Sequence, residues 1–177
     1  KAGIDFMVAM NPQSYIQDVA EINPGGYLLY DSSWKREFHR EDINIIEVPL
    51  TSLCVDEFQN PKTRLLFKNL VYVGALSYLM NICKDIFIEL IQEQFKGKEK
   101  LIAPNVQALD MGFNYAKKHL VDACDIKVNQ KNLTDGMILT NGNNAGGLGC
   151  VYGGATVCAW YPIPPSTSLA ESYKKYC

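Results

Sequence analysis

The chain has 177 residues and a mass of 19.8 kDa, enough for one large domain or for one domain and a piece of another. Apolar residues make up 47% and charged residues 20%, which excludes an intrinsically disordered chain. The formal net charge of -2 argues against nucleic acid as a main partner, and the longest apolar run, residues 70–80, is about half of the roughly 20 residues that a membrane-spanning helix needs.

The first fifty residues predict an alternation of strands and helices. Residues 4–9 form a nearly continuous apolar run, typical of a strand buried in a parallel sheet. A helix is expected to begin after Asn11-Pro12 and to end at residues 23–26, which read Asn-Pro-Gly-Gly. Residues 27–30 and 43–48 are the next predicted strands. The pattern predicts a mainly parallel sheet with helices on both faces, and a chain that is cut at its start, because the first strand begins so soon after residue 1.

A helical stretch is expected to follow this sheet. The four predicted helices are residues 51–58, 64–80, 84–95 and 105–120. Thr51-Ser52 can cap the first of them, and Gly74 lies in the middle of the second, where we expect another backbone to approach closely. The polar residues 125–135 then predict a linker.

The composition changes after the linker, because residues 136–170 contain no charged side chain. Solvated surfaces carry charges every few residues, so we expect this stretch to be buried in a core or in a permanent interface. Its elements are predicted in the order strand, helix, strand, helix, namely residues 137–140, 143–153, 156–160 and 167–176, with Ser166 capping the last helix. So short a piece rarely supports a core of its own, so we expect it to be the start of a larger α/β domain.

Two loops of this second part are candidate ligand sites. The glycine-rich residues 140–147 join a predicted strand to a helix, where α/β proteins often bind phosphate, but they match neither GxGxxG nor GxxxxGK[ST]. Close helix packing at a subunit interface is the alternative. Residues 161–168 hold three prolines and lead into a helix N-terminus, which suits either a loop that presents its backbone to an anionic or planar ligand, or a purely structural turn.

The cysteine, histidine and aspartate residues indicate a functional site less clearly than the two loops do. The six cysteines contain no CxxC pair, and Cys54, Cys83, Cys150 and Cys158 have apolar sequence neighbours, so free thiols and a reduced, cytoplasmic setting are expected. His39 and His119 lie in charged, solvated runs. Three carboxylates are candidate site residues, although strand-end turns or a solvated helix face suit them better: Asp5, Asp31 and Asp110.

The sequence resembles a known family in two places. Residues 139–149 and 160–171 resemble the start of the alpha part of 2-oxoacid:ferredoxin oxidoreductases, in which a GNxAxxLG helix precedes a strand that ends in YPITPST. Residues 1–121 resemble most of the family's gamma domain. The matching features there are Met10-Asn11-Pro12, residues 23–26, 68–70, 74–76 and 95–98, and Asn105.

The resemblance implies an α/β fold class: a Rossmann-like three-layer gamma domain over residues 1–122 with its N-terminal part missing, a linker over 123–135, and the incomplete start of a thiamine pyrimidine-binding alpha domain over 136–177. The order gamma then alpha is that of the fused subunit of two-subunit members. The implied reaction is oxidative decarboxylation of a 2-oxoacid, 2-oxoglutarate or a broad range, to acyl-CoA, with electrons passed to ferredoxin. The fragment alone is expected to be inactive.

The implied cofactors are thiamine diphosphate with Mg and iron–sulfur clusters, with coenzyme A as co-substrate. The implied partners are a beta subunit that carries the diphosphate-binding part, ferredoxin, and further copies in an oligomer of alpha–beta pairs. No cluster-binding cysteine run is present, which fits clusters held on another domain or subunit. A non-catalytic Rossmann-like ligand-binding or assembly module is the alternative function.

The resemblance assigns cofactor and substrate contacts to one loop. These residues are Tyr161, Pro162, Ile163, Pro164, Ser166 and Thr167. The family's threonine between Ile and Pro, implied to touch the substrate, is Pro164 here, which has neither a hydroxyl nor an N–H group. Either Ser166 or Thr167 takes its place, or this copy is impaired, or the residue is misassigned. The acidic residue that activates the aminopyrimidine is expected beyond Cys177.

Overall fold

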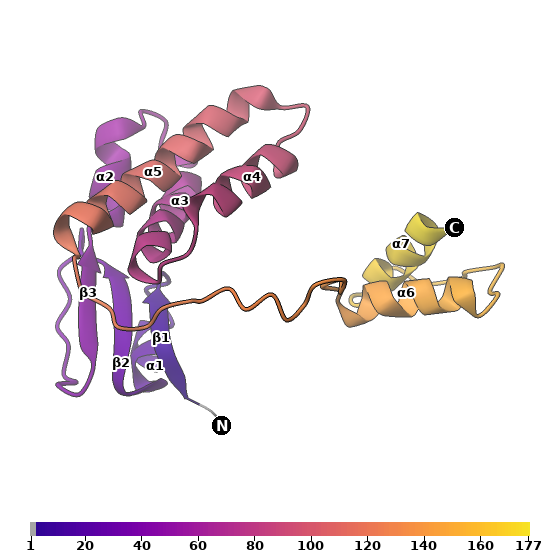
Figure 1. Cartoon of the computed structure of the whole chain (residues 1–177), viewed down its shortest axis with the longest axis horizontal. Coiled ribbons are helices and arrows are strands. Elements are labelled where there is room, and N and C mark those ends of the chain that lie inside the picture. Colours follow the sequence, from indigo (N-terminus) through magenta and orange to yellow (C-terminus); the bar gives the residue numbers. More distant parts are fainter. Residues whose placement is uncertain (1–2) are drawn as a thin grey trace. The chain divides into compact units, whose positions relative to one another are not determined.

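The computed structural model describes residues 3–177, and the chain divides into two units, residues 1–130 and 131–177 (Figure 1). Residues 120–141, between the last helix of the first unit and the first helix of the second, contain turns but no helix or strand. Among the described residues no helix is both long enough and apolar enough to cross a membrane.

The first unit is built on a three-stranded parallel sheet. Its strands are β1 (Ile4–Ala9), β2 (Ile22–Asp31) and β3 (Asn44–Val48), in the spatial order β1-β2-β3, and both neighbouring pairs are parallel. The predicted parallel arrangement is therefore confirmed. β2 begins before the predicted residue 27, because residues 23–26 form a bulge within the strand: Ile4 pairs with Ile22 and Phe6 already pairs with Tyr27.

Both faces of this sheet are covered by helices, as predicted. Tyr27 and Leu29 on β2 join a core with the helices that follow β3, while Leu28 and Tyr30 point the other way and pack with α1 (Tyr15–Ala20). Leu28 and Leu29 are both completely buried. Successive apolar residues can be buried on opposite sides only in a strand that lies between two layers.

The remaining helices of the first unit form one layer. They are α2 (Leu50–Glu57), α3 (Pro61–Leu79), α4 (Lys84–Gln94) and α5 (Ile102–His119), the last preceded by the 3-10 turn η1 (Glu99–Leu101). α3 begins at Pro61, three residues earlier than predicted, because the Asn60 side chain accepts a hydrogen bond from the Lys62 N–H and Pro61 suits the first helical position. The Thr51-Ser52 cap prediction is wrong: Pro49 precedes α2, and neither side chain caps it.

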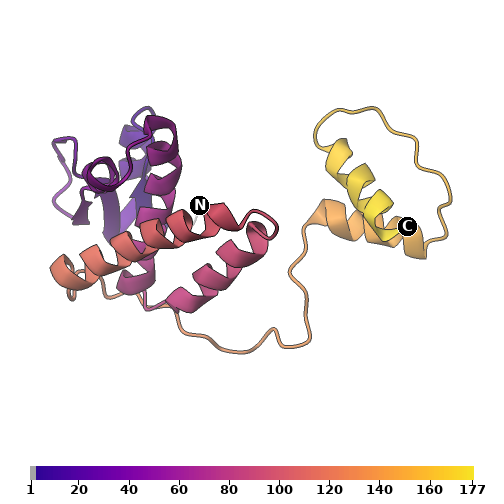
Figure 2. The ribbon, with the colours of Figure 1, turned by 90° about the horizontal axis from the view of Figure 1, so that it is seen from above.

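α3 and α5 cross in backbone contact at two glycines (Figure 2). A Cβ atom on Gly74 would lie 2.0 Å from the carbonyl oxygen of Leu109, and one on Gly112 would lie 1.8 Å from that of Val71. Real Cβ atoms do not approach so closely, so each helix fits against the other only where the side chain is absent. The close approach that the sequence predicts at Gly74 is confirmed.

The second unit consists of two helices and the loops around them. α6 (Gly142–Tyr152) and α7 (Ser166–Tyr176) agree with the predicted helices to within a residue or two. The two predicted strands, residues 137–140 and 156–160, are wrong for this chain by itself, because neither segment is in a strand. A strand needs hydrogen bonds from a neighbouring strand, and no strand of the described chain pairs with either segment.

We expect Gly74→Ala to destabilise the first unit by about 1–3 kcal/mol or more, because the new methyl group must push α5 away from α3. Native-state amide hydrogen exchange should show loss of protection in α3 and α5. Gly149→Ala is the matched control: this helical glycine has no neighbour within 4 Å of its ideal Cβ, so the change should be neutral or stabilising. Unchanged protection in Gly74→Ala would show that the two helices can separate at no cost.

Candidate functional site

The loop before α7 folds onto the start of that helix. The Ser166 hydroxyl lies 3.0 Å from the carbonyl oxygen of Tyr161 and 2.6 Å from that of Ile163, and the Ser166 N–H donates to the same Ile163 oxygen at 2.8 Å. The peptide bond between Pro164 and Pro165 is cis. The prediction that Ser166 caps α7 is wrong, because its hydroxyl faces back into the loop and Pro165 holds the N-cap position.

The glycine-rich segment brings α6 against α7. Asn141 caps α6 by accepting a hydrogen bond from the Asn144 N–H at 2.8 Å, and the Asn143 side chain donates to the Pro165 carbonyl at 3.1 Å and to the Ser168 hydroxyl at 2.6 Å. A Cβ atom on Gly147 would lie 2.7 Å from the Tyr173 backbone nitrogen. Of the two sequence-based alternatives, the geometry favours close helix packing, here between α6 and α7 of the same chain, and packing at a subunit interface stays a prediction.

The three hydroxyl groups that follow the prolines differ in what they contact. Those of Ser166 and Ser168 are both engaged within the loop, since Ser168 also lies 3.0 Å from the Pro165 carbonyl. Thr167 is half-buried, and its hydroxyl makes no hydrogen bond within the described chain. Pro164 is exposed and has no donor. Thr167 therefore offers the free hydroxyl nearest to the position where the family pattern has a threonine.

The surface beside this loop is apolar and uncharged. The exposed fractions are 52% for Trp160, 75% for Tyr161 and 57% for Ile163. The segment before α6 is also exposed, at 79% for Ile138 and 105% for Leu139. The burial predicted for the charge-free residues 136–170 is thus not provided by contacts within the chain. Other protein would be needed to cover these apolar side chains.

A second polar cluster lies at the carboxyl end of β2, around Asp31. Its carboxylate accepts hydrogen bonds from the Thr51 hydroxyl at 2.5 Å and from the backbone N–H groups of Thr51 and Ser33, both at 3.2 Å, and it pairs with the Lys68 ammonium at 3.5 Å. Burial by itself would raise the pKa of Asp31, but the hydrogen bonds from Thr51 and Ser33 outweigh it and hold that pKa below its usual value.

Asp31 therefore joins the sheet to α2 and α3, which goes beyond the strand-end turn that the sequence suggested. The other two candidate carboxylates, Asp5 and Asp110, lie elsewhere. Asp5 accepts a hydrogen bond from Asn23 at 2.8 Å, and Asp110 pairs with Lys84 at 2.5 Å. His39 and His119 are exposed. Within residues 3–177 no three His, Cys, Asp or Glu side chains are placed to hold a metal ion.

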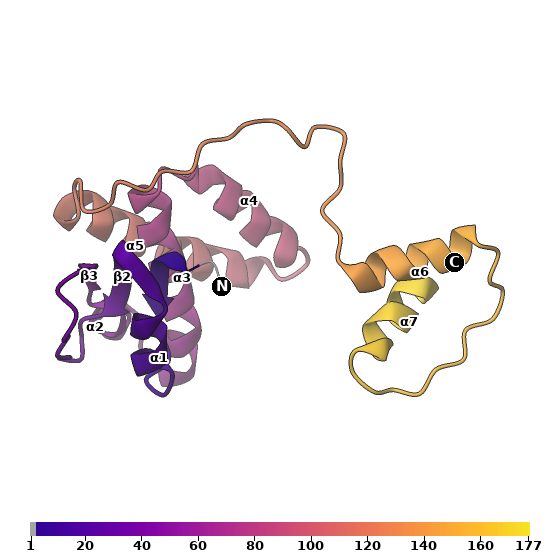
Figure 3. The ribbon, with the colours of Figure 1, turned by 90° about the horizontal axis from the view of Figure 1, so that it is seen from below.

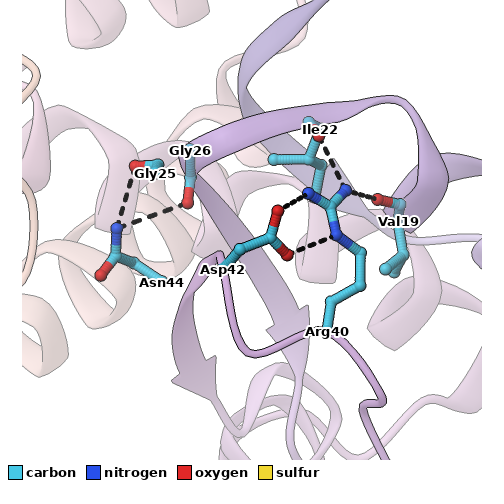
Figure 4. Close-up of polar contacts among 7 residues, drawn as sticks. All are labelled: Val19, Ile22, Gly25, Gly26, Arg40, Asp42 and Asn44. Carbon is cyan, nitrogen blue, oxygen red and sulfur yellow. Dashed lines mark hydrogen bonds and ion pairs between the residues drawn. The ribbon is translucent and has the colours of Figure 1, made fainter.

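Arg40 lies in a charged run that is predicted to be a solvated face, and no local pattern indicates its role. Its guanidinium forms a two-point contact with Asp42, at 2.8 and 2.6 Å, and donates to the carbonyl oxygens of Val19 and Ile22 at 2.9 and 2.7 Å (Figure 4). The Asn44 side chain donates to the Gly25 carbonyl at 3.0 Å in the same view. These bonds fasten the connection between β2 and β3 to the end of α1.

All six cysteines are free thiols, as expected for the four named from sequence. Cys54 is buried, and burial, aided by the negative charge of Asp31, raises its pKa to about 11, so this thiol is unreactive at neutral pH. Cys83 and Cys150 are exposed although their sequence neighbours are apolar. Each lies at or near a helix end, where sequence neighbours do not cover a side chain.

The family can now be assigned. The sequence model described as "Pyruvate ferredoxin/flavodoxin oxidoreductase" matches residues 1–115, which is most of the first unit. The chain belongs to the pyruvate ferredoxin/flavodoxin oxidoreductase family. The resemblance noted from sequence is thus confirmed, as is the α/β fold class with its parallel sheet.

Particular relatives are similar over different parts of the chain. The 2-oxoglutarate oxidoreductase subunit KorA of Mycobacterium tuberculosis is 23% identical over 97% of this chain and 30% of the relative. The alpha subunit of 2-oxoacid:ferredoxin oxidoreductase 2 from Aeropyrum pernix is 26% identical over 61% of this chain and 17% of the relative. The chain thus spans less than a third of the curated relatives that it matches.

A solved structure is similar over nearly the whole chain. It is the 2-oxoglutarate:ferredoxin oxidoreductase from Magnetococcus marinus, with 2-oxoglutarate, coenzyme A and succinyl-CoA bound. The TM-score is 0.84 and the identity 29%, over 99% of this chain and 30% of that one. This similarity extends past residue 115 and so includes the second unit.

We expect Asp31→Asn to cost about 1.5–3 kcal/mol at pH 7, the range for hydrogen bonds to a charged group. Because the folded state lowers the pKa of Asp31, its stabilisation is complete above the unfolded value of about 4 and is lost as the pH falls through the folded value. Urea unfolding at pH 7 and pH 3 should therefore show a smaller difference between the two proteins at pH 3. Asp56→Asn, on the exposed side of α2, is the charge-matched control. If the loss of stability in Asp31→Asn does not change with pH, the ionised carboxylate of Asp31 is not what stabilises the fold.

Proposed function

We propose that this chain is the gamma–alpha portion of a 2-oxoacid:ferredoxin oxidoreductase, the enzyme that oxidatively decarboxylates a 2-oxoacid to acyl-CoA and passes the electrons to ferredoxin. The observation that supports this most directly is the similarity over 99% of the chain to a 2-oxoglutarate:ferredoxin oxidoreductase. Both units are matched in chain order, which is the order of a fused gamma–alpha subunit. A cytoplasmic location fits the six free thiols.

In this proposal residues 1–122 are a gamma-type domain, 123–135 a linker and 136–177 the beginning of the pyrimidine-binding alpha domain. The exposed segments 137–140 and 156–160 each precede a helix, as strands do in a parallel α/β sheet. Their apolar, uncharged side chains suit a sheet completed by strands from outside these residues. Such completion would bury the surface that the chain by itself leaves exposed.

The proposed contacts with the reacting groups lie in the loop before α7. Trp160, Tyr161 and Ile163 offer apolar surface to a planar ring such as the aminopyrimidine of thiamine diphosphate. When bound, that cofactor would supply the electron sink for decarboxylation. The Thr167 hydroxyl and the first-turn N–H groups of α7 suit a 2-oxoacid carboxylate. Pro162 and Pro164 stiffen the loop.

The other cofactors are assigned to partners. We propose that a beta subunit holds the metal and the diphosphate, that the iron–sulfur clusters lie on another domain or subunit, and that the enzyme is an oligomer of alpha–beta pairs. Coenzyme A would be the acyl acceptor and ferredoxin the electron acceptor. For the substrate we propose 2-oxoglutarate or a broad range of 2-oxoacids, which fits the names of the relatives.

The enzyme purified from its native source is expected to contain thiamine diphosphate and iron, and to reduce a viologen dye only when both a 2-oxoacid and coenzyme A are present. Comparing kcat/KM for 2-oxoglutarate, pyruvate and 2-oxoisovalerate would identify the substrate. The alternative, a non-catalytic Rossmann-like ligand-binding or assembly module, is favoured by the proline at position 164. A purified particle without thiamine diphosphate and iron would establish that alternative.

We expect Thr167→Val in the complete enzyme to lower the rate of 2-oxoacid-dependent dye reduction by about 100- to 1000-fold, as for loss of one hydrogen bond to a reacting group. The control is Thr134→Val, a threonine of the linker with an exposed side chain. If Thr167 already takes the place of the family's threonine, Pro164→Thr should leave the rate nearly unchanged. If Pro164→Thr greatly increases the rate of dye reduction and Thr167→Val leaves it unchanged, Thr167 does not supply the hydroxyl that contacts the substrate.

A further inference from the structure

The second unit carries three cysteines that the proposed function does not use. Cys150 on α6 and Cys177 at the end of α7 are exposed, and Cys158 in the connecting loop is partly buried. In the first unit Cys83 is the one exposed thiol among the described residues. Cys150 and Cys177 are therefore the two exposed thiols of the described chain that share a unit.

α6 and α7 pack against each other and run in the same direction (Figure 3). Their contacts advance along both helices together. Near the N-terminal ends the Asn143 amide donates to the Ser168 hydroxyl at 2.6 Å. Further along, Gly147 faces Tyr173, and a Cβ atom on the glycine would lie 2.7 Å from the tyrosine backbone nitrogen. The next contact is expected one helical turn beyond this pair.

Cys150 and Cys177 occupy that next turn. Cys150 follows Gly147 by three residues and Cys177 follows Tyr173 by four, and residues at these spacings lie on one face of a helix. The Cys177 N–H donates to the Tyr173 carbonyl at 3.1 Å, so the helical path continues to the cysteine. In both Figure 2 and Figure 3 the C-terminal end of α7 lies beside the last turn of α6.

The side chain of Tyr173 connects the segments that carry these thiols. Its hydroxyl donates to the Ala155 carbonyl at 2.6 Å, and the Ala155 N–H donates to the Cys150 carbonyl at 3.0 Å. The pKa of Tyr173 is raised first by a side-chain hydrogen bond with Cys177, and further by negative charge on Cys177, Cys158 and Cys150. Three cysteines thus lie around one buried tyrosine, although within residues 3–177 they do not form a metal site.

We propose that Cys150 and Cys177 are an oxidant-responsive pair, which forms a disulfide bond in the presence of a low-molecular-weight disulfide. The thiolate of one cysteine attacks a sulfur of the oxidant and releases a first small thiol. The thiolate of the other cysteine then attacks the mixed disulfide and releases the second. One S–S bond forms in the protein and one breaks in the oxidant, which takes up two electrons. The two cysteine protons end on the two released thiols.

The bond joins the C-terminal ends of α6 and α7 and closes a ring that contains the whole loop before α7. Two short helices have little core of their own, so a cross-link between them is expected to have a large effect on their packing. Amide protection in both helices should rise by about 30- to 1000-fold on oxidation, the range that corresponds to an ordinary disulfide.

The test treats the reduced 177-residue chain with oxidised glutathione, blocks the remaining thiols and maps the bonds by mass spectrometry. Trypsin leaves residues 132–174 and 176–177 as separate peptides, which a bond to Cys177 joins, and chymotrypsin cuts between Cys150 and Cys158. The bond is expected between Cys150 and Cys177. Glutathione should remain attached to exposed thiols that have no partner.

The matched control is Cys158→Ser, which should leave the bond unchanged because it removes the third thiol of the same unit. In Cys150→Ser, Cys177 should carry glutathione and form no bond with Cys158. Circular dichroism confirms that each variant is folded. In concentrated urea the bond should shift to Cys150 and Cys158, because an unfolded chain closes its shortest loop most readily.

The proposal is overturned if glutathione is found on both Cys150 and Cys177 with no bond between them, or if Cys158→Ser prevents the bond. It is also overturned if the folded chain gives the same bonds as the chain in urea, or if the bonds join two copies of the chain. None of these outcomes depends on the oxidoreductase activity.

Discussion

The backbone contact between α3 and α5 is the constraint on which the first unit depends. At Gly74 and Gly112 the two helices lie so close that a backbone carbonyl group of the facing helix occupies the space where a side chain would be. α3 is also tied to the sheet, because Lys68 pairs with Asp31 at the carboxyl end of β2. The close approach of α5 to α3 thus follows from two residues that have no side chain.

The second unit leaves most of its uncharged segment exposed. α6 and α7 hold each other through Gly147 and the Asn143 amide, yet most of the uncharged segment around them stays in contact with solvent. Two helices cannot enclose a core of the size that the apolar side chains require. Burial of the charge-free segment in a core or in a permanent interface therefore stays a prediction, which contacts within the described chain do not fulfil.

The internal hydrogen bonds of the loop before α7 narrow the chemistry that it can support. Ser166 and Ser168 hold the loop in shape, so they are poorly suited to bind a substrate at the same time. Thr167, two residues after Pro165, is left as the loop hydroxyl with no hydrogen-bond partner in the described chain. The proposed function therefore depends on Thr167 and not on position 164.

By itself the sequence determined the elements whose signals are local: the apolar runs of β1 and β2, the helices, and the motifs of a family whose model matches residues 1–115. It also indicated a close backbone contact at Gly74, because a glycine inside a helix lowers the stability of that helix and is expected where a neighbouring backbone leaves no room for a side chain. Only the tertiary structure decided that Gly112 is its counterpart, that Asp31 and Arg40 fasten distant segments, and that Thr167 rather than Ser166 has a free hydroxyl. It also showed that residues 137–140 and 156–160 are not strands on their own. Strand pairing, helix crossing and hydrogen-bond choice all depend on groups far apart in the chain, and no pattern of neighbouring residues encodes which of them will meet.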